Sequence, residues 1–148
     1  MPNLTNKQIA ERLRRWADAV AAKPKREFDM GTWGCEKYRF GVHCGTVHCA
    51  AGTAAVTPYF KRKGLRLDFS DSRIVDPDWE NDEVRANVVC ENEAGERLTG
   101  EQALAHVTGA TVPQIANIVY ATKATKAEIV KAIRALATIY ETVGNVYQ

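Results

Sequence analysis

The sequence feature that most constrains the fold is a run of small residues from 44 to 55, Cys-Gly-Thr-Val-His-Cys-Ala-Ala-Gly-Thr-Ala-Ala. Side chains this small allow another backbone to approach closely, so the run predicts a buried helix at a close helix crossing. Gly45 or Thr46 is the expected N-cap, since either one can serve the first free amides of the helix. The rest of the chain is expected to pack around this helix. Its predicted buried face contains Val47, Ala50, Ala51, Ala54 and Ala55, with Gly52 beside them.

A helix is also predicted at the start of the chain. Thr5 and Gln8 form a capping box, and Leu4 with Ile9 forms the hydrophobic staple that accompanies one. Pro24 cannot continue a helix, so this one is expected to end near residue 23. Its apolar stripe contains Ile9, Leu13, Trp16, Ala17 and Val20.

Further helices are expected at 57–64, where Thr-Pro restarts the chain after the small-residue run, and in the C-terminal third. Thr99 and Gln102 form a capping box that opens one helix, and Gly109 closes it. Another covers residues 112–120, and the pattern Thr-x-x-Glu at 125–128 opens the last. The last helix is expected to bury Ile129, Val130, Ile133, Leu136, Ala137 and Tyr140, with Gly144 past its end.

The segments between these helices predict one aromatic loop and one small sheet. Residues 28–43 show neither helical nor strand periodicity, yet they hold several large apolar side chains. We therefore expect an ordered loop packed over the core by aromatics such as Trp33. Residues 65–69 alternate as a half-buried strand does, and residues 70–83 are acidic and rich in turn formers. The β-prone residues 84–90 turn at 92–95 into 96–98, which predicts a hairpin or meander.

Together these elements predict a single α+β domain over residues 1–148, mainly helical, with about five helices and a small antiparallel hairpin or meander. A chain of this length buries roughly two thirds of the surface that its unfolded form exposes, so folding needs no metal or disulfide. No apolar run approaches the ~18 residues of a membrane span, and residues 1–10 lack the apolar core of a signal peptide. We therefore expect a cytoplasmic protein with no membrane association, its four cysteines as thiols and no cofactor.

The formal net charge of +2 conceals two oppositely charged segments. Residues 1–26 carry seven basic and two acidic side chains, whereas residues 68–96 carry ten acidic and two basic ones. The favoured interpretation is that these are solvated faces that attract one another. A second hypothesis is that the acidic segment imitates nucleic acid and occupies a basic partner. A third is that nucleic acid binds a basic patch, which requires one face to gather Arg12, Arg15, Lys61, Arg62 and Lys63.

The cysteines of the small-residue run present a choice between reactive and structural thiols. A nucleophilic Cys49 or Cys44 would gain thiolate character from the amides at a helix N-terminus. The candidate bases are His43, His48 and His106. Papain-like enzymes place two residues between their paired cysteines, whereas this chain places four, and adjacent helical residues such as 48 and 49 point about 100° apart. We therefore expect small apolar thiols packed at the helix crossing.

Metal binding or a disulfide would give the cysteines a different role. Zinc would find ligands in Cys35, His43, Cys44, His48, Cys49 and Cys90, but structural zinc sites usually combine two separated close pairs, and Cys35 has no near partner. A disulfide between Cys44 and Cys49 requires that the helix start after Cys44. The alternating acids Asp76, Asp78, Glu80 and Asp82 imitate a calcium loop, but Asn81 replaces its turn glycine and Asn87 its twelfth ligand, so a solvated acidic loop is expected.

Four segments resemble an uncharacterised family of small bacterial and phage-encoded proteins. They are residues 28–34, with Trp33, residues 44–52, the Leu-Thr-x-Glu-Gln-Ala stretch at 98–103, and the last capped helix. The family's hallmark is a tryptophan loop followed by a Cys-Gly-Thr-x-x-Cys-x-x-Gly helix start, here Cys44, Gly45, Thr46, Cys49 and Gly52. The resemblance implies a helical fold and a phage or prophage context, but no reaction and no site residue. His48 and the acidic stretch 68–96 depart from the family pattern.

These observations favour a non-enzymatic binding or accessory protein that acts through its surface, most simply on another protein. Three competing hypotheses stay open. One is a cysteine-dependent hydrolase or transferase that uses Cys49 at a helix N-terminus, and the second is an acidic inhibitor that imitates nucleic acid. The third is a nucleic-acid binder whose basic residues gather on one face.

Overall fold

The computed structural model describes residues 4–24, 28, 35–39, 42–47, 49–68, 81–85, 87–121 and 123–147. Side chains are described for these residues except 35–39, 42–47, 81–85 and 144–147. This part of the chain forms six helices and two three-stranded antiparallel sheets. The fold is therefore mainly helical α+β, as predicted. None of the described helices is both long and apolar enough to cross a bilayer.

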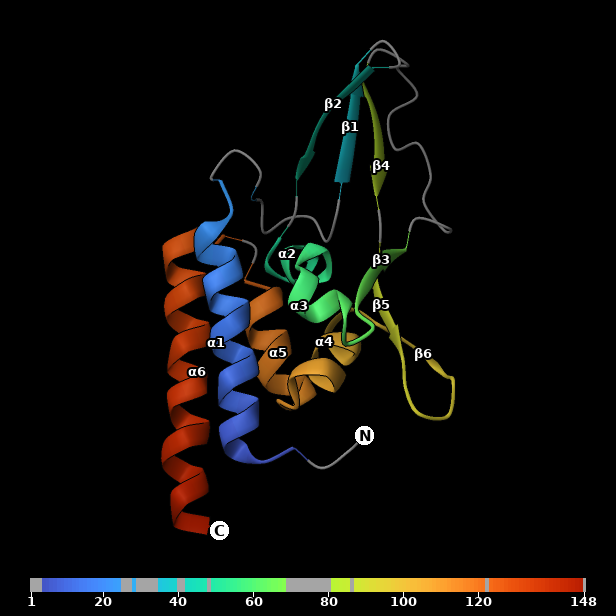
Figure 1. The fold of residues 1–148 in the computed structure, drawn as a ribbon. Coiled ribbons are helices and arrows are strands. Elements are labelled where there is room, and N and C mark those ends of the chain that lie inside the picture. Colours follow the sequence, from blue (N-terminus) through green and yellow to red (C-terminus); the bar gives the residue numbers. More distant parts are fainter. Residues whose placement is uncertain are drawn as a thin grey trace.

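Two long antiparallel helices, α1 (Asn6–Ala22) and α6 (Lys126–Tyr147), lie side by side along one flank of the molecule (Figure 1). Four shorter helices lie next to them: α2 (Ala50–Val56), α3 (Pro58–Lys61), α4 (Gly100–Thr108) and α5 (Val112–Val119). One sheet, of order β3-β5-β6, borders these short helices, and the other, of order β2-β1-β4, extends away from the helices. The main core lies between α1, α6 and the short helices.

Helix α1 forms as predicted. The Thr5 hydroxyl accepts a hydrogen bond from the Gln8 amide at 3.1 Å, and the Gln8 side chain accepts one from the Thr5 amide at 2.9 Å, which completes the capping box. The helix ends at Ala22, with Lys23 as the C-cap. Its buried stripe contains the five predicted residues and one more, Ala10. Leu4 packs against the core beside it.

Helix α2 begins later than predicted. Its N-cap is Cys49, and Gly45, Thr46 and Val47 belong instead to the strand β2 (Val42–Val47). The expected N-cap at Gly45 or Thr46 is therefore wrong, as is the place of Val47 on the helix. The physical reason is strand pairing: Thr46 and Val47 are β-branched residues that suit a ladder, and they pair with Glu36 and Cys35.

The shortened α2 is nevertheless the buried centre of the fold. Residues 50–55 are all buried, and α2 contacts α1, α3, α4, β3 and β5. The indole nitrogen of Trp16 donates to the carbonyl of Ala50 at 2.8 Å, where both residues are fully buried. The Thr53 hydroxyl donates to the Cys49 carbonyl at 2.8 Å, so this buried polar group is satisfied. The predicted burial of Ala51 and Gly52 is confirmed.

The sheet β2-β1-β4 corrects the prediction of an aromatic loop at 28–43. The strand β1 (Cys35–Arg39) pairs with β2 on one edge and with β4 (Asn81–Arg85) on the other. The register between β1 and β2 shifts after Lys37, because Lys37 pairs with Gly45 and Tyr38 with His43. Trp33 lies outside the described residues, and Phe28 is half-buried against the core.

The second sheet confirms the antiparallel sheet predicted for 65–98. Strand β5 (Asn87–Glu91) pairs with β3 (Arg66–Asp68) and with β6 (Arg97–Thr99). In the turn between β5 and β6, the Asn92 side chain accepts from the amides of Ala94 and Glu96. The single β-prone segment expected at 84–90 is in fact two strands, β4 and β5, which belong to different sheets. Residues 81–83, expected to form turns, are extended because β4 pairs with β1.

The caps of the later helices agree only in part with the predicted ones. The Thr125 and Glu128 side chains bond each other's amides, as predicted, and a capping box at Thr111 and Gln114 opens α5 without having been expected. The box predicted at Thr99 is wrong: Thr99 is held in the β6 ladder and makes no capping bond, and Gly100 follows it with a positive φ of 59°.

The two ends expected from glycines have different outcomes. Gly109 closes α4 with a φ of +88°, as predicted. Helix α6 instead continues past Gly144 to Tyr147. A glycine inside a helix costs only ~1 kcal/mol relative to alanine, which is too little to stop a long helix.

We predict that Ala51→Leu lowers stability by ~1–3 kcal/mol, because α2 is enclosed on every side and has no room for three more carbons. The midpoint of chemical denaturation measures the loss. The matched control is Ala132→Leu on the exposed side of α6, which should leave the midpoint nearly unchanged. Equal midpoints for Ala51→Leu and the parent protein would contradict the close packing.

A second prediction compares two glycines that share a left-handed backbone. Gly95→Ala should cost ~1–2 kcal/mol from its φ of +80° alone, because a Cβ there meets nothing within 4 Å. Gly109→Ala should cost more, by ~1–3 kcal/mol, because its Cβ would lie 2.7 Å from Ile9 Cγ1 and 2.9 Å from Leu4 Cδ1. Thermal melting of both variants would reveal the difference. Equal losses would show that the side chains of Leu4 and Ile9 can move aside at no cost in stability.

Candidate functional site

The two cysteines whose side chains are described are both buried. Cys49 is the N-cap of α2 and is 2% exposed. Cys90 on β5 is 1% exposed, and its sulfur lies 3.7 Å from the carbonyl of Ala103. Burial, followed by the charge of Glu91, raises the pKa of the Cys90 thiol. Reactive cysteines are accessible and have lowered pKa values, so Cys90 has the properties of a structural thiol, and Cys49 lacks the access that a nucleophile needs.

The remaining candidates of the cysteine chemistry are spread over different elements. Cys35 begins β1, whereas His43 and Cys44 belong to β2, where the register shift leaves Cys44 without an opposite residue. His48 lies outside the described residues. His106, in the last turn of α4, lies 3.9 Å through Nε2 from the Glu93 carboxylate. Among the side chains that the structure describes, no three His, Cys, Asp or Glu residues are grouped as a metal site would require.

The calcium-loop candidates are partly placed. Asp76, Asp78 and Glu80 lie outside the described residues, and Asn81 and Asp82 belong to the extended strand β4. A calcium loop curls around its ion, so a strand is the wrong backbone for these two positions.

Acidic side chains of the second sheet are engaged by basic ones. The Arg66 guanidinium binds both carboxylate oxygens of Glu91 at 2.7 Å, and Arg97 contacts Asp68 at 3.0 Å. The hydrogen bond from Arg66 is the main cause that lowers the pKa of Glu91. These pairs join β3 to β5 and to β6, so part of the charge in the acidic segment is neutralised within the sheet.

Basic side chains from two separate parts of the chain meet around Tyr59, and we call this group the Tyr59 cluster. The Tyr59 ring, on α3, lies 4.6 Å from Lys63 Nζ and 5.1 Å from Arg15 Cζ of α1. Both distances are typical of cation–π contacts. The ring is held in turn by an edge-to-face contact with the fully buried Phe60, whose centroid is 5.0 Å away.

Two more cations complete the Tyr59 cluster. Burial and the neighbouring charges of Arg12 and Arg62 lower the pKa of the Lys63 ammonium, and the carboxylate of Glu11 opposes this effect only in part. Arg12 is fixed by a 2.7 Å hydrogen bond from its guanidinium to the carbonyl of Val107. The positive charges of the cluster are therefore close enough to repel one another, and a bound anion would reduce this repulsion.

Four of the five residues predicted for a basic patch belong to this cluster. Lys61 is exposed on α3, but no described contact joins it to the others. Tyr59 was not predicted. The sequence does contain a signal for it, because Tyr59 precedes Lys63 by four residues and side chains at that spacing can contact each other across one helical turn.

No family model matches this chain, and comparisons with curated proteins and with solved structures find no match either. The resemblance to the bacterial and phage family therefore stays a prediction.

We predict that Cys49 and Cys90 resist iodoacetamide near neutral pH until denaturant is added. Both thiols are buried and therefore out of reach of the reagent, and the raised pKa of Cys90 also reduces its thiolate fraction. Mass spectrometry of peptides would quantify each cysteine separately, with the denatured protein as the fully labelled control. Rapid labelling of Cys49 in the native protein would favour a cysteine-dependent enzyme.

Proposed function

We propose that the protein is a non-enzymatic binding protein and that its Tyr59 cluster binds the phosphate backbone of nucleic acid. The observation that carries this proposal is the meeting of Arg15 and Lys63 over one tyrosine ring. Burial, followed by the charges of Arg12 and Arg62, lowers the pKa of Lys63. Arginine and lysine supply most phosphate contacts in protein–nucleic acid complexes. A polyanion would favour the charged form of Lys63 and remove the repulsion.

The geometry favours a polymer over a small anion. The cations lie on two elements, α1 and the end of α3, and are spread around an aromatic side chain rather than directed into a closed pocket. Basic grooves with interleaved aromatic residues are typical of proteins that follow a nucleic acid backbone without reading its sequence. We infer that recognition is independent of sequence and sensitive to salt.

The other two hypotheses have less support. A cysteine-dependent hydrolase or transferase requires an accessible Cys49, and that residue is 2% exposed. An inhibitor that imitates nucleic acid requires an unneutralised acidic face, whereas Glu91 and Asp68 bind Arg66 and Arg97. A cytoplasmic location, a phage or prophage origin and a protein partner stay part of the proposal on the sequence evidence alone.

The test is a salt titration of binding to a short fluorescent oligonucleotide. Three or four phosphate contacts should give a slope of log K against log salt of roughly −2 to −4 between about 50 and 200 mM salt. Lys63→Gln or Arg15→Gln should each reduce the steepness of this slope by about one and weaken binding at 0.1 M salt by about fivefold to tenfold.

Lys123→Gln is the matched control, because Lys123 is an exposed lysine before α6 and should leave the slope unchanged. An equal loss in Lys123→Gln would show that net charge alone is measured. Absence of binding by the parent protein at low salt would refute the proposal.

A further inference from the structure

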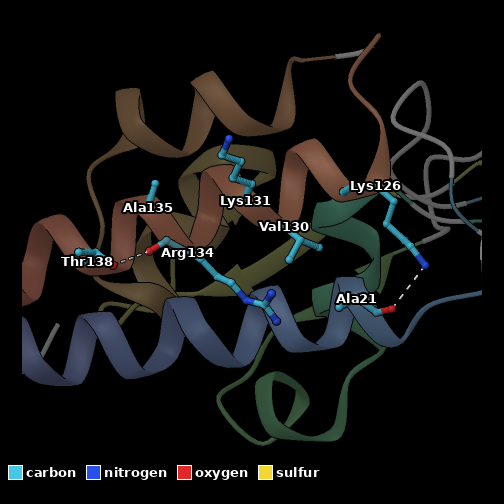
Figure 2. A pocket seen from close by; sticks show the side chains of 8 residues that line it. Ala21, Lys126, Val130, Lys131, Arg134, Ala135 and Thr138 are labelled. Atoms are coloured by element: carbon cyan, nitrogen blue, oxygen red, sulfur yellow. Dashed lines mark hydrogen bonds between the residues drawn. The ribbon is translucent and has the colours of Figure 1, made fainter.

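A groove of about 580 Å³ runs along the outer face of the α1–α6 pair (Figure 2). Most of its lining comes from α6, and Ala21 contributes from α1. The lining is of two kinds: small or apolar side chains, among them Ala21, Val130 and Ala135, and the cations Lys126, Lys131 and Arg134. None of the lining residues is acidic.

The three cations are held in different ways. The Lys126 ammonium donates to the carbonyls of Lys23 at 2.9 Å and Ala21 at 3.4 Å, which places it at the negative end of α1. Arg134 lies 3.3 Å from Asp18, but the two side chains are 50% and 68% exposed, so this ion pair is weak. Lys131 is exposed and extends away from α1, whereas Arg134 extends toward α1 (Figure 2). The groove therefore has a floor of small and apolar side chains and three cations along its rim, one of which pairs with Asp18.

We propose that this groove is the docking site for an acidic amphipathic helix of a partner protein. The row of small residues along α6, with Ala21 of α1 beside it, is suited to a third helix, which would place its apolar face on the alanines and Val130. Carboxylates along its flanks would meet Lys131 and Arg134, so charge complementarity selects an acidic partner.

Two other occupants fit the groove less well. A second copy of the chain related by a two-fold axis would set Lys131 and Arg134 against their own copies, because an isologous interface pairs a surface with itself. A phosphate backbone would meet the rim charges but gain nothing from an apolar floor. The proposal is independent of nucleic acid binding at the Tyr59 cluster, whose cations Arg12 and Arg15 contact α4 and Tyr59 rather than α6.

The experiment uses the full chain and a designed helical peptide with leucine along one face and glutamate along both flanks. We expect saturable binding by fluorescence anisotropy, and amide chemical shift changes at Ala21, Val130 and Ala135 in NMR spectra. A peptide with lysine in place of glutamate should not bind. Lys131→Glu, an exposed position that should not disturb folding, should weaken binding of the acidic peptide by roughly fivefold or more.

Ala135→Arg separates docking in the groove from simple charge attraction. This variant adds a positive charge but obstructs the apolar floor, so it should weaken binding of the acidic peptide, whereas pure electrostatics would strengthen it. Lys63→Gln, in the Tyr59 cluster, should leave peptide binding unchanged, so failure of either proposal is distinguished from failure of the other. No binding of the acidic peptide, tighter binding by Ala135→Arg, or shift changes in the groove on adding an oligonucleotide would each overturn the proposal.

Discussion

The arrangement of the helices depends on the hydrogen bond from the Trp16 indole to the carbonyl of Ala50. A buried indole N–H without an acceptor would cost about 1–3 kcal/mol, so this contact sets how α1 faces α2. Helix α1 then joins two further elements, since Arg12 bonds the carbonyl of Val107 in α4 and Arg14 pairs with Glu141 of α6. The small residues of α2 make this possible, because five elements can approach a helix whose side chains occupy so little space.

The charges of the chain are divided between structure and surface. In the sheet β3-β5-β6, arginines and carboxylates neutralise one another across strands. Around Tyr59 the opposite holds: cations gather, with Glu11 as a minor counterion. A formal charge of +2 therefore describes neither region. Local fields, rather than net charge, decide what such a protein attracts.

Local sequence signals predicted the parts of the fold that form locally. The capping box at Thr5 and Gln8, the stripe of α1 and the turn after β5 need only residues that are near in sequence. The strand β1 could not be predicted in this way. Its first residue, Cys35, pairs with Arg85, which is far along the chain, and with Val47, which the sequence pattern assigned to a helix. The site followed the same rule: the basic residues 61–63 were visible in the sequence, but only tertiary packing brings Arg15 to Tyr59.

Two of the chain connections between the sheet β2-β1-β4 and the rest of the protein are one residue long. A single residue separates β2 from the N-cap of α2, and a single residue separates β4 from β5. In mechanical terms, a load carried by these two connections acts directly on α2 and β5, which are buried and contact each other in the core.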